Sequence, residues 1–212
     1  MVLDKKVAEQ TVNFLLQINA IKLNTKNPFT WTSGIKSPIY CDNRLILSYP
    51  DVRKFIADSM SEIIKNKYGE NISIAGVATG AIAIGAMIAE KLNLPYAYVR
   101  PKPKSHGLKN QIEGKIQTGS NIVVIEDLIS TGMSSLNAIN ALKSENYKVN
   151  GMLSIFSYNF DFANNKFNDE KILVNSLADY NTLVELIESQ GTLKSYEIMR
   201  LKKWREDPKT WK

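Results

Sequence analysis

Apolar and polar residues alternate along this chain in a pattern that predicts helices and strands in turn. Apolar residues recur at helical spacing over residues 4–19, where Asp4 is placed to cap the helix, and again from Pro50 to Tyr68. Beyond Tyr68, short apolar runs typical of buried strands alternate with helical segments. The expected strands cover residues 72–77, 95–100, 121–127, 149–156 and 171–177, and the expected helices cover 80–93, 132–146, 179–190 and 193–206.

This alternation predicts an α/β fold in which helices flank both faces of a central parallel sheet. Neither an internal repeat nor a linker interrupts the pattern, so we expect residues 1–212 to form a single domain. Residues 23–44 are rich in turn formers and aromatic residues and have no steady period. We therefore expect residues 1–50 to form a small N-terminal hood on the sheet.

Composition and charge narrow the class of protein. The 212 residues, 44% of them apolar and 23% charged, suit a globular domain with a sizeable core. A single cysteine, Cys41, excludes an internal disulfide framework, and the charged first residues leave no signal-peptide core, so a cytoplasmic location is expected. No apolar run is long enough to span a membrane. The net charge of +6 is compatible with nucleic acid, an anionic membrane surface or a polyanionic small substrate.

The strongest chemical signal is "NIVVIEDLISTGMSSL" at residues 121–136. A buried-looking strand ends in Glu126 and Asp127, and a Ser-Thr-Gly turn at 130–132 then leads into a helix. Ligands bind beyond the carboxyl ends of parallel strands, and a helix N-terminus attracts phosphate. A capped helix alone would explain the turn but not two acids beside a phosphate site. A ribose 5-phosphate explains both, because carboxylates accept hydrogen bonds from ribose hydroxyls.

The stretch "VVIEDLISTGMS" resembles the phosphoribosyl pyrophosphate (PRPP) signature of the type I phosphoribosyltransferases. Two more segments resemble the orotate phosphoribosyltransferase branch of that family: "FTWTSGIKSPIYCDNR" at 29–44 and "RPKPKSHGLKNQIEG" at 100–114. The resemblance implies a type I phosphoribosyltransferase fold with a hood, and transfer of phosphoribose from PRPP to orotate in pyrimidine biosynthesis. It also implies Mg²⁺ as cofactor, bound mainly through PRPP, so that no metal ligand is expected from the protein.

The resemblance also implies roles for individual residues. The PRPP-binding residues would be Arg100, Lys104, His106, Glu126, Asp127, Leu128, Ile129, Ser130, Thr131, Gly132, Met133 and Ser134, of which Lys104, His106, Glu126 and Asp127 would be catalytic. The pyrophosphate loop would be Ala78, Thr79, Gly80 and Ala81, and the orotate-binding residues would be Ser33, Gly34, Tyr40, Cys41 and Ser130. The family resemblance further implies a homodimer in which the loop bearing Lys104 and His106 reaches the neighbouring subunit's site.

The basic loop makes physical sense in this role. Loss of pyrophosphate leaves an oxocarbenium-like ribose and builds negative charge on the departing group, which cations stabilise. His106 is the only histidine, and its place between Lys104 and Gly107 in a polar loop favours a functional role over a core position.

Some positions depart from the family pattern. Thr32, Thr79 and Pro101 stand at or near positions where some members have lysine, and "SIFSYNF" lacks an arginine that some members use for orotate. Lys36, Arg44 and Lys102 could replace the positive charges that are missing at these positions. Alternatively, backbone N–H groups around residues 33–37 hold the orotate carboxylate.

Three other functions fit these residues less well. A purine phosphoribosyltransferase would share the signature at 126–134 but not the segment "SGIKSPIY". A PRPP-sensing regulator would need a DNA-binding element, and no helix-turn-helix with a basic recognition helix is evident. A non-catalytic ribose-phosphate-binding module would not require the basic loop. We therefore expect small-molecule substrates and neither nucleic acid nor membrane as partners.

Overall fold

The structure, a computed structural model, describes residues 1–31, 34–103 and 110–211 of the chain. At its centre is a six-stranded sheet built from β5 (Ser73–Val77), β6 (Tyr96–Val99), β7 (Ile112–Glu113), β8 (Asn121–Ile129), β9 (Lys148–Ser157) and β10 (Val174–Asp179). The strand order is β10-β9-β8-β5-β6-β7, and within this sheet only the short edge strand β7 runs antiparallel to its neighbour. The predicted parallel α/β architecture is confirmed.

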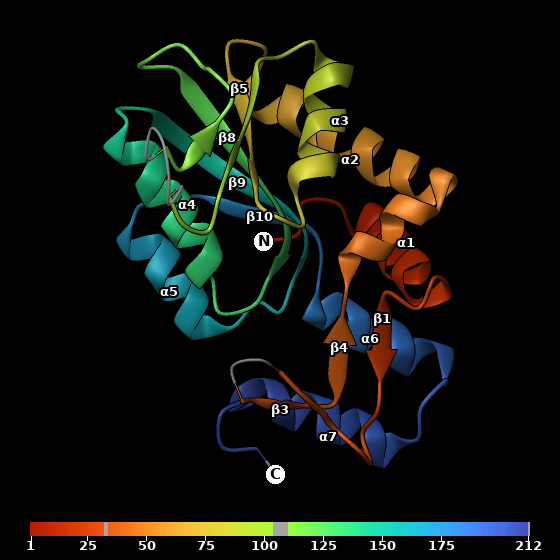
Figure 1. Ribbon diagram of the computed structural model, residues 1–212. Coiled ribbons are helices and arrows are strands. Elements are labelled where there is room, and N and C mark those ends of the chain that lie inside the picture. The colour runs from red at the N-terminus through yellow and green to blue at the C-terminus, as the bar shows by residue number, and fades with distance from the viewer. Residues whose placement is uncertain (32–33, 104–109, 212) are drawn as a thin grey trace.

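Helices cover both faces of this sheet (Figure 1). One face packs against α1 (Lys5–Gln17), α2 (Pro50–Tyr68) and α3 (Ile82–Leu92), and the other against α4 (Met133–Ser144) and α5 (Asp161–Asp169). Consecutive side chains of β8 enter opposite cores: Val123 and Ile125 enter the first, and Ile122 and Val124 enter the second. Burial on both faces explains why this strand is a continuous apolar run in the sequence.

The expected helices and strands occur within a few residues of their predicted bounds. The Asp4 carboxylate caps α1 as expected, because it accepts a hydrogen bond from the Val7 N–H at 3.0 Å. Helix α5 was missed, because its sequence is polar and buries only Ala163 and Phe167. Among the described residues, no helix is long and apolar enough to cross a membrane.

Two small antiparallel strand pairs lie beside the main sheet. β1 (Ile21–Leu23) pairs with β4 (Ile39–Cys41), and β2 (Phe29–Thr30) pairs with β3 (Lys36–Ser37). We call these four elements the hood strands. A 3-10 helix, η1 (Asn43–Ser48), connects them to α2. Helix α1, although it belongs to residues 1–50, covers the sheet instead.

The C-terminal part of the chain completes this region. Helix α6 (Tyr180–Gln190) leads to α7 (Ser195–Glu206), which lies against the hood strands (Figure 1). The buried Trp204 indole N–H donates a hydrogen bond to the Lys36 carbonyl at 2.9 Å, and its ring meets the Trp31 ring edge-on at 5.7 Å. The hood strands are therefore held in part by the C-terminal helix α7.

Candidate active site

The residues singled out in the sequence follow neighbouring strands at the same edge of the sheet. The segment 78–81 follows β5, Arg100 follows β6, and the acid pair lies near the end of β8. Because β5 pairs in parallel with both β6 and β8, these carboxyl ends meet. The meeting is close: a Cβ atom added at Gly80 would overlap the carboxylate of Asp127. The predicted pyrophosphate loop and the acid pair thus lie in direct contact.

This contact explains why residue 80 has no side chain. We expect Gly80→Ala to displace the Asp127 carboxylate or the loop. With PRPP, the ligand that the resemblance implies, the KM is expected to rise by about tenfold, since misplaced binding groups lose much of their effect. Steady-state kinetics with varied PRPP measure the change. Gly69→Ala is a control in which an added Cβ meets no atom within 4 Å, although its φ of +73° makes it mildly destabilising. A KM unchanged in Gly80→Ala would contradict the close contact.

The two acids differ in their surroundings. Glu126 is 4% exposed, and its Oε2 accepts a hydrogen bond from the Ser135 hydroxyl at 2.8 Å. Burial raises the pKa of Glu126 well above its usual value, and the neighbouring charge of Asp127 raises it further. Burial also raises the pKa of Asp127, while the guanidinium of Arg44 acts in the opposite direction. Glu126 therefore faces inward onto α4, whereas Asp127 faces Gly80.

The turn after β8 leaves the start of α4 open to an anion. Gly132 has φ of +75°, a conformation that favours glycine, and α4 begins one residue later than the sequence predicted. Among the described residues, no side chain caps this helix, so its first N–H groups and its dipole are open to a phosphate. Ser134 is exposed in this first turn. The start of α4 is therefore open, and its role as a phosphate seat stays a prediction.

A small cavity brings three of the predicted segments together. Its volume is about 50 Å³, and Ala78, Arg100 and Ser134 line it from the loop after β5, the end of β6 and the first turn of α4. The Ala78–Thr79 peptide bond in this loop is cis.

The basic loop is anchored at both ends. The Arg100 N–H donates to the Gln111 carbonyl at 2.9 Å, and the Gln111 side-chain amide donates back to the Arg100 carbonyl at 2.9 Å. The guanidinium of Arg100 also pairs with Glu113 at 3.4 Å. Lys104 and His106 lie outside the described residues, so their predicted roles stay predictions.

The orotate-type segment places its residues in contrasting environments. Tyr40, on β4, is 40% exposed, and its ring lies 5.7 Å from that of Phe29. Cys41 is buried, which raises the pKa of its thiol well above the usual value, and the thiol donates a hydrogen bond to Asn43 Oδ1 at 3.2 Å. Gly34 is exposed with φ of +82°, and Ser33 lies outside the described residues.

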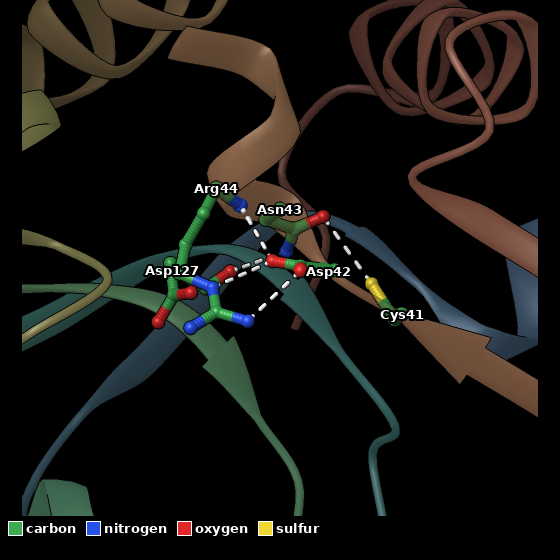
Figure 2. Close-up of polar contacts among 5 residues, drawn as sticks. All are labelled: Cys41, Asp42, Asn43, Arg44 and Asp127. Carbon is green, nitrogen blue, oxygen red and sulfur yellow. Dashed lines mark hydrogen bonds and ion pairs between the residues drawn. The ribbon is translucent and has the colours of Figure 1, made fainter.

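Three polar residues after β4 also reach the site, although the sequence indicated only Arg44 among them (Figure 2). The Asn43 side-chain amide donates to the Asp127 carbonyl at 2.6 Å. The guanidinium of Arg44 holds both carboxylate oxygens of Asp42, at 2.7 and 2.8 Å, and lies beside Asp127. The available signal was the run of three polar residues, 42–44, that ends the orotate-type segment. Nothing in the sequence marked Ser135 as the partner of Glu126.

Comparison with known proteins gives consistent results. The family model described as "Phosphoribosyl transferase domain" matches residues 46–159. A protein of Phocaeicola vulgatus named orotate phosphoribosyltransferase is 47% identical over 209 residues, which cover 99% of this chain and 97% of that protein. The crystal structure of orotate phosphoribosyltransferase from Aeropyrum pernix superposes with a TM-score of 0.74 at 28% identity, covering 86% of this chain and 99% of that one. The orotate phosphoribosyltransferase of Mycobacterium tuberculosis in complex with PRPP shares the fold, with a TM-score of 0.64 at 20% identity, covering 84% of this chain and 98% of that one.

Proposed function

The chain belongs to the orotate phosphoribosyltransferase family, and we propose that it transfers the 5-phosphoribosyl group from PRPP to orotate, giving orotidine 5′-monophosphate and pyrophosphate. The observation that carries this proposal is the contact of Gly80 with the Asp127 carboxylate beside the open N-terminus of α4. A ligand that spans these groups needs a phosphate at one end, hydroxyls in the middle and a second anionic group, which is the chemistry of PRPP.

The ribose and its phosphates are assigned to described residues. We assign the 5-phosphate to residues 128–134, whose turn and helix start offer N–H groups and hydroxyls. Asp127 accepts hydrogen bonds from the ribose hydroxyls, and the loop 78–81 holds the pyrophosphate. Glu126, turned onto Ser135, supports the acid pair from within.

The orotate ring is assigned to the side of the site that faces the hood strands. Tyr40 offers an exposed ring there, and Gly34, Ser33, Cys41 and Ser130 complete the proposed set. Among the three residues that could replace the missing family cations, Arg44 lies beside Asp127.

The chemical step needs stabilisation of charge on the leaving pyrophosphate. Arg100, Lys104 and His106 supply cations and donors for that charge in the proposal, and closure of the loop over the substrates excludes water. Asp127 carries negative charge near the developing ribosyl cation. The proposal includes a single domain with a hood, a cytoplasmic homodimer, and a loop shared between the two sites.

Mg²⁺ fits this site as a companion of PRPP. Within the described ranges, no group of three histidine, cysteine, aspartate or glutamate side chains converges to hold a metal. Mg²⁺ is commonly bound by one or two carboxylates together with substrate phosphates, and Asp127 is a partly exposed carboxylate at the proposed ribose position. When bound, the ion supplies positive charge to the pyrophosphate.

An absorbance assay of orotate tests the proposed reaction. Purified protein is expected to consume orotate only when PRPP and Mg²⁺ are both present. Controls leave out each component in turn, and addition of pyrophosphate to the product is expected to regenerate orotate. Orotate that stays unchanged under the complete conditions would contradict the proposed function.

A further inference from the structure

The buried amide of Asn43 joins the hood strands to the acid pair. Asn43 is 1% exposed and begins η1, directly after the segment that carries Tyr40 and Cys41. Its Oδ1 accepts a hydrogen bond from the Cys41 thiol at 3.2 Å, and its Nδ2 donates to the Asp127 carbonyl at 2.6 Å (Figure 2). One side chain thus spans two segments that are 84 residues apart in the chain.

The bond between Cys41 and Asn43 is buried, and the bond from Asn43 to the Asp127 carbonyl is partly buried. A carbonyl that is shielded from much of the solvent loses free energy when its donor is removed, so the Asp127 carbonyl favours the position in which Asn43 reaches it. The contact is made to the backbone of Asp127 and leaves its carboxylate free to face Gly80. A shift of β4 relative to β8 would therefore break a partly buried hydrogen bond.

We propose that Asn43 is a positioning residue that fixes the orotate-binding strand β4 relative to the ribose-binding acid Asp127. This inference rests on the proposed function, because it concerns the alignment of the two substrates of that reaction. Bond formation requires the orotate nitrogen to face the anomeric carbon of the ribose at close range. Asn43 touches neither substrate and acts through Asp127 and Cys41.

Such a role affects turnover more than the binding of either substrate alone. Apart from the basic loop, the groups assigned to PRPP lie on β8, α4 and the loop after β5, and Asn43 bonds to the Asp127 backbone rather than to these side chains. A misplacement of the reacting groups by about 1 Å can lower the rate by about a hundredfold. Loss of Asn43 is expected to lower kcat while PRPP still binds in the absence of orotate.

The test compares two variants of Asn43 with a matched control. Asn43→Leu removes both hydrogen bonds at similar volume, and Asn43→Asp keeps the acceptor for the thiol of Cys41 but replaces the donor to Asp127. Asn175→Leu is the control, because Asn175 is also buried and its amide donates to the Met1 carbonyl at 3.1 Å, on the distant edge strand β10. Each variant is examined by kcat with both substrates saturating and by calorimetric titration with PRPP and Mg²⁺ alone.

The expected result is a kcat lowered by about tenfold or more in both Asn43 variants, a PRPP Kd changed by less than about threefold, and a normal kcat in Asn175→Leu. If Asn43→Leu does not fold, Asn43→Asp alone decides the outcome. An active wild-type protein whose Asn43 variants keep the kcat of the control, or lose PRPP binding in parallel with kcat, would overturn this inference alone. A wild-type protein that leaves orotate unchanged would overturn the proposed function and this inference with it.

Discussion

Replacement of Asp127 by asparagine is expected to lower turnover by about a hundredfold or more while the protein stays folded, by comparison with other electrostatic groups of active sites. The asparagine has nearly the same shape, so the contact with Gly80 and the backbone bond from Asn43 are retained. What is lost is the negative charge beside the developing ribosyl cation and one strong acceptor for the ribose hydroxyls.

A surface carboxylate provides the matched control for this change. Asp58 pairs with Lys54 at 2.7 Å and with Lys91 at 2.8 Å, away from the predicted site residues. We expect Asp58→Asn to leave turnover within about twofold of the wild type, because surface ion pairs contribute little to the stability of the fold. Turnover in Asp127→Asn equal to that of Asp58→Asn would contradict the role assigned to the acid pair.

Mixing two inactive variants is expected to restore activity if the basic loop serves the neighbouring subunit. Lys104→Ala damages the loop, and Asp127→Asn damages the acid pair. In a mixed dimer one site receives both lesions, and the other receives an intact loop with an intact acid pair. Random exchange of subunits in a symmetric dimer therefore restores at most about a quarter of wild-type activity.

The measurement is the rate of orotate consumption before and after subunit exchange. Each variant incubated alone serves as the control, and formation of mixed dimers is followed with two different affinity tags. A loop that acts on its own subunit leaves one lesion in every site, so no activity would return. Mixed dimers without activity would contradict the shared site and leave the enzyme assignment unaffected.

The sequence predicted the elements of the fold whose apolar residues form a strong pattern. β8 is buried on both faces, and its run of aliphatic residues therefore indicated a buried strand. Helix α5 buries only two side chains and carried no comparable pattern. The hydrogen bond from Trp204 to the Lys36 carbonyl joins positions that are 168 residues apart. The local sequence of either segment therefore does not predict it.

In the candidate site, too, the sequence predicted contacts within one contiguous segment but not contacts between distant segments. The acid pair, the turn at 130–132 and the open start of α4 are contiguous, so their arrangement follows from one strand-turn-helix unit. The contact of Gly80 with Asp127 depends on the pairing of β5 with β8, and the bond from Asn43 depends on the path of the chain from β4 into η1. These contacts are set by packing between segments, which no short motif encodes.

Competition among bases tests the central claim most directly. The wild-type protein is given PRPP and Mg²⁺ with equal amounts of orotate, uracil, adenine and hypoxanthine, and the nucleotides formed are identified by mass. The account predicts that orotidine 5′-monophosphate is the dominant product from the first turnovers onward. Faster formation of a purine nucleotide, or of uridine 5′-monophosphate directly from uracil, would contradict it.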